Sequence, residues 1–157
     1  RMQSKILLIG VIPKYCSSEY GYIEFKEEIP ETQNLYKVKS FLEKPDNSLA
    51  KKIYNNDNFL WNTGIFLFNN RIHNLVFKDK FFNTYQTISL VIDNSKKIDD
   101  CIILNSDTFK TIMINDPFDK MYLETAFSEA IVTKHDSNWY DCGSQTSIEY
   151  LKKVNLI

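Results

Sequence analysis

Residues 5–12 form a nearly continuous apolar run, Lys-Ile-Leu-Leu-Ile-Gly-Val-Ile, which ends at Pro13. A run of this kind is typical of a β-strand that is covered on both faces. Further strands are predicted over residues 20–25 and 35–42, where apolar side chains alternate or cluster on either side of a polar turn. The chain is therefore expected to build a sheet around a strand that has no solvent-exposed face.

Helices are predicted where apolar residues recur at helical spacing. Asp46 and Asp116 are candidate N-caps, and Thr146 with Glu149 has the spacing of a capping box. One or more further helices are expected within residues 96–113. The apolar positions of the four periodic helices are Leu49, Ala50, Ile53 and Tyr54; Ile72, Leu75, Val76 and Phe82; Met121, Leu123 and Ala126; and Ile148, Leu151 and Val154.

Two more strands are predicted, a buried one over residues 64–68 and another over residues 128–134. Because strands and helices alternate along the chain, the expected fold class is α/β, with a mixed sheet flanked by helices. No internal repeat or low-complexity linker divides the chain, so residues 1–157 are predicted to form a single domain.

Composition and charge exclude several classes of protein. With 43% hydrophobic and 25% charged residues, the chain has a globular composition and not a disordered one. A net charge of -1 argues against nucleic acid as a main partner, because binding to phosphates needs a basic face. No apolar run approaches the roughly 20 residues of a membrane span, and no secretory leader pattern is present. We therefore expect a cytoplasmic protein with no membrane partner.

Cysteine and glycine usage narrows the chemistry further. Cys16, Cys101 and Cys142 lie far apart and form no Cys-x-x-Cys motif, so reduced thiols are expected, and with only two histidines a zinc site is not. The four glycines are scattered, and no Gly-rich phosphate-binding motif occurs. The sequence does not support an isolated nucleotide-binding function.

Glu43 and Lys44 stand at the end of a predicted strand, directly before Pro45. Because a proline favours an extended residue before it and a change of direction after it, both charges are expected to converge on the crevice at the carboxyl edge of the sheet. There a carboxylate can accept hydrogen bonds from sugar hydroxyls, and an ammonium suits a phosphate. The alternative is a solvated Glu-Lys pair before a turn.

Three further positions have a functional and a structural interpretation. Asn62, in Trp-Asn-Thr-Gly, either presents its amide to a polyol or belongs to a packed tryptophan and a glycine bulge. Asp141, between a predicted strand and a helix, is either an oxygen ligand for Mg²⁺ or a helix cap. Gly21, in Tyr-Gly-Tyr-Ile, either lets a sugar approach the backbone or lies in an aromatic strand pair.

The order and spacing of four motifs resemble those of mannose-1-phosphate guanylyltransferases, the GDP-mannose pyrophosphorylases of the sugar-nucleotidyltransferase superfamily. The resemblance extends from about residue 6 to residue 151, and Phe118-Asp119-Lys120 with Glu124 matches a further family segment loosely. The four motifs are Tyr-Gly-Tyr-Ile at residues 20–23, Phe-Leu-Glu-Lys-Pro-Asp at 41–46, Trp-Asn-Thr-Gly-Ile-Phe-Leu-Phe at 61–68 and Trp-Tyr-Asp-Cys-Gly-Ser at 139–144.

The resemblance implies a Rossmann-like fold and the transfer of GMP from GTP to mannose 1-phosphate, with release of pyrophosphate. It implies that Gly21, Glu43 and Asn62 hold the sugar and that Lys44 binds the sugar phosphate. Asp141 would be one of two carboxylates that bind Mg²⁺, the expected cofactor. Lys44 and Asp141 are accordingly the candidate catalytic residues.

The chain departs from the family pattern at its start. The family's Gly-rich stretch, its Arg-Leu-x-Pro-Leu segment and a further metal-binding aspartate are absent. The chain is therefore expected to correspond to the C-terminal half of the catalytic domain, without the N-terminal nucleotide-binding portion. It is expected to be inactive alone and to associate with that half or with itself, because missing strands expose a sheet edge.

The chain also differs from the family pattern at two local positions, and two alternative functions stand beside this interpretation. Ser18-Glu19 stands where the family usually has Thr-Gly, and Gln145 stands where it tends to have tryptophan. One alternative is a non-catalytic remnant or interaction domain that keeps the fold. The other is a nucleotidyltransferase for another sugar 1-phosphate.

Overall fold

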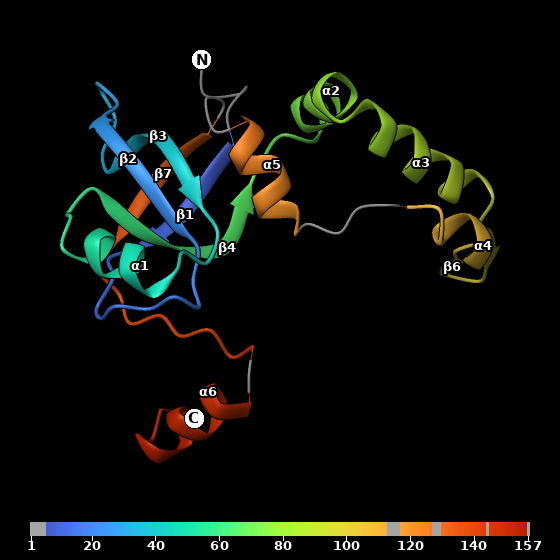
Figure 1. Cartoon of the computed structure of the whole chain (residues 1–157). Coiled ribbons are helices and arrows are strands. Elements are labelled where there is room, and N and C mark those ends of the chain that lie inside the picture. The colour runs from blue at the N-terminus through green and yellow to red at the C-terminus, as the bar shows by residue number, and fades with distance from the viewer. Residues whose placement is uncertain (1–5, 113–116, 127–129, 144, 157) are drawn as a thin grey trace.

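The computed structural model describes residues 6–112, 117–126, 130–143 and 145–156. Most of the strand residues lie in a closed barrel, in which β7 pairs with β1 on one side and with β3 on the other. The strands around the barrel are, in order, β1 (Ile6–Val11), β4 (Phe59–Leu67), β2 (Tyr22–Glu28), β3 (Leu35–Leu42) and β7 (Ala130–His135) (Figure 1). β1 and β7 run parallel and the other neighbouring pairs are antiparallel. The α/β class and the mixed strand directions are confirmed, but the expected sheet flanked by helices is closed on itself.

Side chains alternate between two apolar clusters along the barrel wall. Ile23 of β2 and Leu60 of β4 are register partners in the larger cluster, and the adjacent partners Tyr22 and Trp61 belong to the smaller one. The helix α5 (Phe118–Ala126) adds Tyr122 and Leu123 to the larger cluster. The helix α1 (Asn47–Tyr54) adds Ile53 to the smaller one. Both faces of the β2–β4 pair are therefore buried.

Gly10 lies where β1 and β4 approach each other most closely. The register of the β1–β4 pair shifts between Leu8 and Gly10, and Gly10 then pairs with Asn62. A Cβ atom at position 10 would lie 2.7 Å from Cδ1 of Leu60 and 3.0 Å from Cγ2 of Val132. The buried run predicted over residues 5–12 thus depends on a residue without a side chain at this point.

The prediction for α1 is confirmed at its start and is partly wrong along its face. The Asp46 carboxylate accepts hydrogen bonds from the backbone N–H groups of Ser48, at 2.8 Å, and Leu49, at 2.9 Å. Ala50 and Ile53 are buried, but Leu49 and Tyr54 are exposed, because this two-turn helix covers the barrel with a narrow stripe.

The strand expected over residues 64–68 is longer than predicted, and its burial was misplaced. The buried residues of β4 are Leu60, Trp61 and Asn62, whereas Ile65 and Leu67 are more than half exposed. The reason is that β2 pairs with residues 59–61 of β4, whereas β1 is the one strand among the described residues that pairs with the remainder of β4.

Residues 70–112, which we call the arm, differ most from the sequence-based expectation: Phe77 at the start of the arm belongs to the larger apolar cluster, and the arm then extends away from the barrel (Figure 1). The predicted single helix is two, because the backbone leaves the helical region at Phe81 (φ -128°). One or more helices were expected within residues 96–113: residues 96–103 instead form a β-hairpin, with Asp99 in its turn at a φ of +50°, whereas residues 106–109 are helical as expected. The elements of the arm are α2 (Asn70–Lys80), α3 (Phe82–Asp93), β5 (Lys96–Ile98), β6 (Cys101–Ile103) and α4 (Ser106–Phe109).

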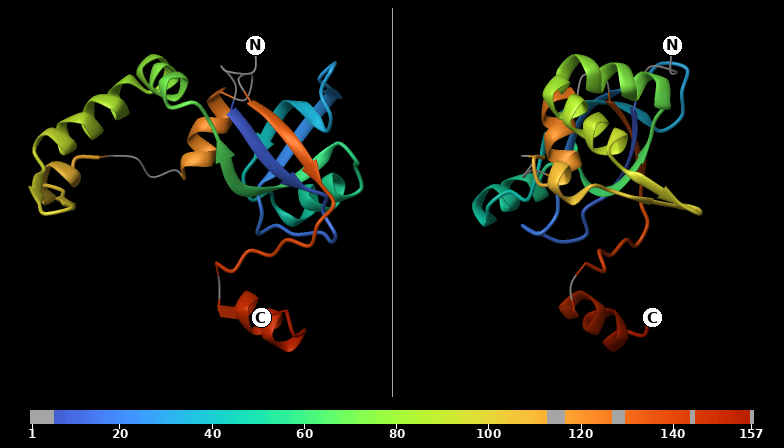
Figure 2. Two further views of the ribbon diagram at one scale, coloured as in Figure 1. Left: turned by 180° about the vertical axis from the view of Figure 1, so that it is seen from behind. Right: turned by 90° about the vertical axis from the view of Figure 1, so that its right-hand side faces the viewer.

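The C-terminal helix α6 (Gln145–Lys153) follows an extended segment that leaves the end of β7 (Figure 2). It begins one residue before Thr146, and Gln145 donates a hydrogen bond to the Glu149 carboxylate at 3.0 Å. The side chain of Thr146 and the whole of Asp116, both predicted as caps, lie outside the described residues. In α6 Leu151 is buried, and Val154 beyond its end is exposed.

Cys16, Cys101 and Cys142 are exposed free thiols, as expected. Across the described part of the chain, we find no helix with the length and apolar character needed to cross a membrane.

We predict that Gly10→Ala lowers the free energy of unfolding by about 1–3 kcal/mol, because the new methyl group overpacks the contact between Leu60 and Val132. Urea unfolding followed by circular dichroism measures this. Lys26→Ala on the exposed side of β2 is the control and is expected to change stability by less than about 0.5 kcal/mol. An unchanged midpoint for Gly10→Ala would contradict the close approach of β1 and β4.

A cross-strand pair predicts a pH dependence. Desolvation raises the pKa of the Glu24 carboxyl, but hydrogen bonds from Lys39 at 2.5 Å and Ser40 at 2.7 Å outweigh it, so that the net pKa is lowered. The stabilisation is therefore complete above the unfolded-state pKa of about 4.3 and is lost as the pH falls through the lower folded-state value.

Glu24→Gln is accordingly expected to destabilise the protein by up to about 1 kcal/mol near neutral pH and by progressively less below about pH 4. Thermal unfolding of both proteins from neutral to acidic pH measures the difference. Glu31→Gln at an exposed turn is the control. A difference that grows as the pH falls would contradict the lowered pKa.

Candidate functional site

All five residues that the sequence singled out line one cavity of about 220 Å³. They are contributed by the segment before β2, the turn after β3, the middle of β4 and the segment after β7. The full lining consists of Glu19, Tyr20, Gly21, Glu43, Lys44, Asn62, Thr63, Gly64, Asp119, Trp139 and Asp141. The structure therefore brings together side chains that are up to 120 positions apart in the sequence (from position 21 to position 141).

Gly21 lies directly against the Glu43 carboxylate. A Cβ atom at position 21 would lie 2.8 Å from Oε2 of Glu43 and 3.1 Å from the ring of Phe41. The Gly21 carbonyl accepts a hydrogen bond from the backbone N–H of Asn62 at 2.8 Å. The glycine therefore allows the carboxylate to sit over the backbone at the edge of the cavity.

Asn62 is the one buried polar residue of the part of the chain that the structure describes, with 7% of its surface exposed. Its Nδ2 donates to Oδ2 of Asp119 at 3.2 Å, and its Oδ1 accepts from the backbone N–H of Gly64 at 3.2 Å. The amide thus has its donor and its acceptor engaged and is held in a fixed orientation at the cavity wall.

The backbone conformation of Lys44 differs from the one that Pro45 predicted. The residue before the proline was expected to be extended, yet Lys44 has a φ of +41°. This is the left-handed region, which a residue with a Cβ enters at an energetic cost, and such residues cluster at functional sites. Pro45 is buried and Asp46 caps α1, so the two residues after Lys44 are fixed in position. The backbone of Lys44 therefore adopts the unfavourable conformation that the turn requires. The ammonium side chain is exposed and lines the cavity.

Asp141 is exposed at the cavity wall and is held by a tight turn. Its Oδ1 accepts a hydrogen bond from the backbone N–H of Gly143 at 3.0 Å. A Cβ atom at position 143 would lie 3.1 Å from the same oxygen, so a glycine suits this turn. The cap interpretation of Asp141 is not what the structure shows, because α6 begins four residues later.

The sequence did not single out Glu19 and Asp119 as site residues, yet both line the cavity. Glu19 was noted only as a departure from the family pattern, and Asp119 only in a loose match. No local pattern predicts the contact of Asp119 with Asn62, because it depends on how α5, which carries Asp119 in its first turn, packs against the barrel. Together with Glu43 and Asp141, Glu19 and Asp119 give the described cavity lining four carboxylates, against the one ammonium of Lys44.

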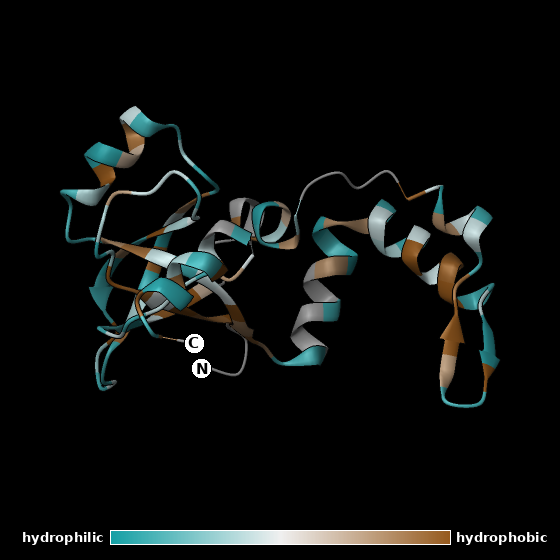
Figure 3. Cartoon of the chain, turned by 90° about the horizontal axis from the view of Figure 1, so that it is seen from below, coloured by the Kyte–Doolittle hydropathy of each residue, from teal (hydrophilic) through white to brown (hydrophobic). Residues whose placement is uncertain are grey.

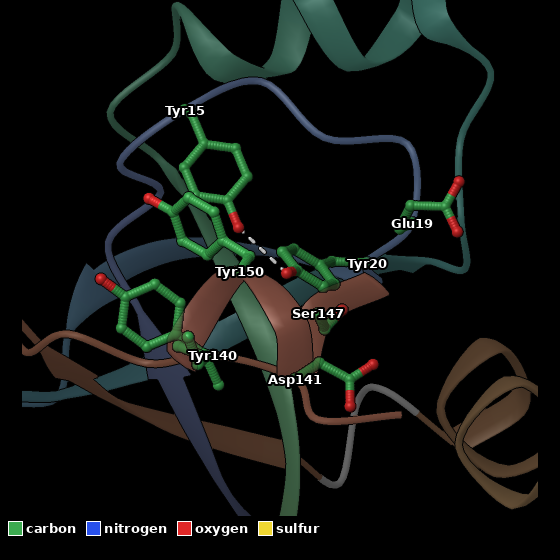
Figure 4. Close-up of a pocket in the computed structure, with 8 residues that line it drawn as sticks. Tyr15, Glu19, Tyr20, Tyr140, Asp141, Ser147 and Tyr150 are labelled. Atoms are coloured by element: carbon green, nitrogen blue, oxygen red, sulfur yellow. Dashed lines mark hydrogen bonds between the residues drawn. The ribbon is translucent and has the colours of Figure 1, made fainter. Parts of the chain in front are cut away.

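A larger cavity of about 720 Å³ adjoins the first and shares Glu19, Tyr20 and Asp141 with it. Figure 4 shows Tyr15, Tyr20, Tyr140 and Tyr150 around it, with Ser147 on α6 and Asp141 before the start of this helix. The hydroxyl groups of Tyr15 and Tyr20 lie 3.0 Å apart. Burial, and then this hydrogen bond, raise the pKa of the Tyr15 phenol well above its usual value, so the ring stays uncharged.

Aromatic packing holds Tyr20, which lines both cavities, in place. Trp61 is 1% exposed and meets Tyr15 and Tyr20 edge-on, with ring centroids 4.7 Å and 5.0 Å away. Trp139 meets Tyr20 at 5.2 Å. The indole N–H of Trp61 is buried and has no hydrogen-bond partner among the described residues. The tryptophan was interpreted as packing in one alternative, and the structure confirms that part of it.

This cavity is compatible with one of the ways in which proteins commonly bind magnesium. Among the described residues, no group of three histidine, cysteine, aspartate or glutamate side chains lies close enough to hold a metal unaided. Mg²⁺ is commonly bound by one or two carboxylates together with substrate phosphates. The exposed Asp141 carboxylate fits the role of such a single protein ligand.

The chain is similar to nucleotidyl transferases over nearly its whole length. The Nucleotidyl transferase family matches residues 1–154. Mannose-1-phosphate guanylyltransferase 2 of Escherichia coli O157:H7 is 32% identical over 152 residues, which are 93% of this chain and 31% of that protein. A mannose-1-phosphate guanylyltransferase of Salmonella muenchen is 28% identical over 96% of this chain and 31% of its own length. The chain thus spans less than a third of these relatives.

A solved structure from Thermus thermophilus, described as a mannose-1-phosphate geranyltransferase, has the same fold. The match has a TM-score of 0.74 at 17% identity and covers 96% of this chain and 41% of that one. A Helicobacter pylori structure described as mannose-6-phosphate isomerase matches with a TM-score of 0.74 at 19% identity and covers 88% of this chain and 53% of that one.

We predict that Asn62→Asp lowers the free energy of unfolding by about 2 kcal/mol or more at pH 7, because it sets two carboxylates within hydrogen-bonding distance. The loss should shrink near pH 4, where one of the two carboxyl groups takes up a proton. Urea unfolding at both pH values measures it.

The double variant Asn62→Asp with Asp119→Asn exchanges the amide and the acid and is expected to recover at least half of the lost stability. Asn58→Asp at an exposed turn is the matched control, with a change below about 0.5 kcal/mol. If the double variant were no more stable than Asn62→Asp, the bond between positions 62 and 119 would not be the cause.

Proposed function

We propose a function for this chain from one premise: it belongs to the nucleotidyl transferase family. In this proposal residues 1–157 form the sugar-binding half of a mannose-1-phosphate guanylyltransferase domain, which converts GTP and mannose 1-phosphate to GDP-mannose and pyrophosphate. The observation that carries the proposal is the cavity of about 220 Å³ in which Gly21, Glu43, Lys44, Asn62 and Asp141 meet. The relatives that share the sequence are described as mannose-1-phosphate guanylyltransferases.

The sugar ring would bind against the wall formed by Gly21, Glu43 and Asn62. The Glu43 carboxylate, held over Gly21, can accept hydrogen bonds from two hydroxyl groups. The Asn62 amide oxygen accepts one hydrogen bond from the backbone N–H of Gly64, and its second lone pair can accept another from a sugar hydroxyl. Because Asp119 fixes this amide, the wall is preorganised for a ligand that carries several hydroxyl groups.

Lys44 would bind the sugar phosphate. Its ammonium is the one cation among the described residues of the cavity lining, which also contains four carboxylates. The attack of one phosphate on another brings two anions together, so neutralisation and positioning supply most of the catalysis in phosphoryl-type transfer. The strained backbone of Lys44 directs the charge into the cavity from the end of β3.

Asp141 would hold Mg²⁺ together with the phosphates and a second carboxylate from outside this chain. A bound Mg²⁺ supplies positive charge that stabilises the developing charge on the phosphate oxygens. The backbone N–H of Gly143 donates to Oδ1 of Asp141 and so fixes the orientation of the carboxylate. Oδ2 is then the oxygen that would bind the cation.

A second candidate function is that of a non-catalytic remnant or interaction domain that keeps the fold. The acidic lining favours it, because the negative charge of Glu19 repels a sugar phosphate and so weakens productive binding. A nucleotidyltransferase for a different sugar 1-phosphate is a third interpretation of the same wall. Binding and turnover measured on the same protein distinguish all three.

We expect mannose 1-phosphate to bind this chain in isothermal titration calorimetry with Mg²⁺ present, and Lys44→Gln to weaken that binding by about ten-fold or more. Glu43→Gln should weaken it similarly, because the neutral amide accepts hydroxyl hydrogen bonds less strongly. Glucose 1-phosphate and inorganic phosphate are titrated in parallel. Stronger binding of glucose 1-phosphate than of mannose 1-phosphate would indicate that the chain serves a different sugar 1-phosphate.

GDP-mannose formation from GTP, Mg²⁺ and mannose 1-phosphate is then measured with this chain alone and mixed with a separately produced nucleotide-binding portion. Product only on mixing, abolished by Asp141→Ala, is the expected result. Binding without product in either case would favour the non-catalytic interpretation. Lys51→Gln, at an exposed position of α1, is the control and should leave both binding and product formation unchanged.

A further inference from the structure

The function proposed above assigns no ligand to the larger cavity, of about 720 Å³, beside α6. Four of its eight described lining residues are tyrosines, Tyr15, Tyr20, Tyr140 and Tyr150, and we call it the tyrosine cavity (Figure 4). Pockets that bind small organic molecules commonly have volumes of about 300–1,000 Å³ and are lined mainly by apolar and aromatic side chains. The tyrosine cavity therefore has the size and the lining of a site for an organic ligand.

The four tyrosine rings follow one another around this cavity. Tyr15 and Tyr20 have ring centroids 6.3 Å apart, and Tyr140 and Tyr150 have ring centroids 6.4 Å apart. Burial and the contact with Tyr20 raise the pKa of the Tyr15 phenol, and the nearby phenol of Tyr150 raises it further. Tyr150 thus links the two pairs, and the segments before β2, after β7 and in α6 together form one aromatic wall.

Two tryptophans hold part of this wall in place. The buried Trp61 meets Tyr15 and Tyr20 edge-on, and Trp139 meets Tyr20 edge-on. Even so, 43% of the surface of Tyr15 and 54% of the surface of Tyr150 are exposed. Aromatic surface that is fixed in position and open to a cavity is preorganised for a ligand, because little conformational entropy is lost when the ligand binds.

The charge of the described lining is negative. Glu19 and Asp141 are exposed carboxylates in it, and its described residues include no lysine, arginine or histidine. Neither carboxylate forms an ion pair within the part of the chain that the structure describes. The face of an aromatic ring is also negative and attracts cations. An anionic ligand would therefore be repelled here, whereas an organic cation is attracted by the rings and by the carboxylates.

The hydrogen bonding of the lining favours a cation that has no N–H groups. The hydroxyl groups of Tyr15 and Tyr20 lie within hydrogen-bonding distance of each other, and Oδ1 of Asp141 already accepts from Gly143. A primary ammonium is strongly hydrated, so it would exchange its water for few hydrogen bonds in this cavity. A quaternary ammonium has no donors to satisfy, and aromatic side chains around a cavity are a common means of binding it.

We propose that the tyrosine cavity binds a quaternary ammonium group, with the four tyrosine rings around the cation and the carboxylates of Glu19 and Asp141 supplying the opposite charge. The tyrosine cavity adjoins the cavity of about 220 Å³ and shares Glu19, Tyr20 and Asp141 with it. The proposal does not rest on the function proposed for the smaller cavity, whose ligand is an anion and whose single described cation is Lys44.

The test is a set of NMR titrations of the full chain with choline, ethanolamine and 3,3-dimethyl-1-butanol, without Mg²⁺ or sugar phosphate. The three probes share a hydroxyethyl chain and end in a trimethylammonium, an ammonium and an uncharged tert-butyl group. About 0.15 M salt screens attraction between exposed charges. Choline is expected to bind with a Kd of about 1 mM or below, and the other two probes about ten-fold more weakly or worse, because one lacks the methyl groups and the other the charge.

Variants of Tyr150 test the role of the rings. Tyr150→Leu should weaken choline binding by about five-fold or more, whereas Tyr150→Phe keeps the aromatic face and should bind within about two-fold of the wild type. Because Tyr150 is more than half exposed, both variants are expected to fold, which far-ultraviolet circular dichroism verifies. Phe82→Leu is the matched control and should bind like the wild type, because this exposed residue belongs to α3 of the arm, which extends away from the barrel and α6 (Figure 3).

Each of the opposite outcomes would overturn the proposal. If 3,3-dimethyl-1-butanol bound as tightly as choline, the cavity would be an apolar pocket without preference for charge. If ethanolamine bound as tightly, the carboxylates and not the rings would decide the binding. Choline binding that is undetectable, or that Tyr150→Leu leaves unchanged, would contradict a cation site between the rings.

Discussion

The pairing of β2 with β4 is the contact on which the barrel, both apolar clusters and the polar cavity depend. Tyr22 with Trp61 and Ile23 with Leu60 fill opposite faces of the same ladder, so the two clusters are fixed relative to each other. The ladder ends in the hydrogen bond from Asn62 to the Gly21 carbonyl. A displacement of β4 would therefore move core side chains and cavity side chains together.

Local sequence patterns predicted the elements whose structure is decided locally. The strand over residues 35–42 and the Asp46 cap are such cases, because a pleated apolar pattern and a capping carboxylate act within a few residues. The hairpin at residues 96–103 was missed because Lys-Lys-Ile-Asp-Asp has no glycine or asparagine at the turn. Asp99 adopts a positive φ there, which an aspartate tolerates but which its presence alone does not predict.

The cavity could be predicted in part, because the motif residues lie on strands of one barrel or directly next to them. Gly21, Glu43 and Asn62 meet because β2, β3 and β4 are neighbours. Asp119 was not predictable in the same way, because its approach to Asn62 depends on how α5 packs against the barrel through Tyr122 and Leu123. The burial of β4 was misplaced for a related reason: the number of neighbouring strands, and not hydrophobicity, decides which part of it is covered.

The positive φ of Lys44 has a consequence for how this protein tolerates substitution. A glycine would adopt that backbone conformation without a steric penalty, so relief of strain favours the loss of the side chain. The ammonium that lines the cavity would be lost with it. Folding stability and the phosphate binding that we propose for Lys44 thus favour different residues at this position, and a screen for thermostable variants would select against its charge.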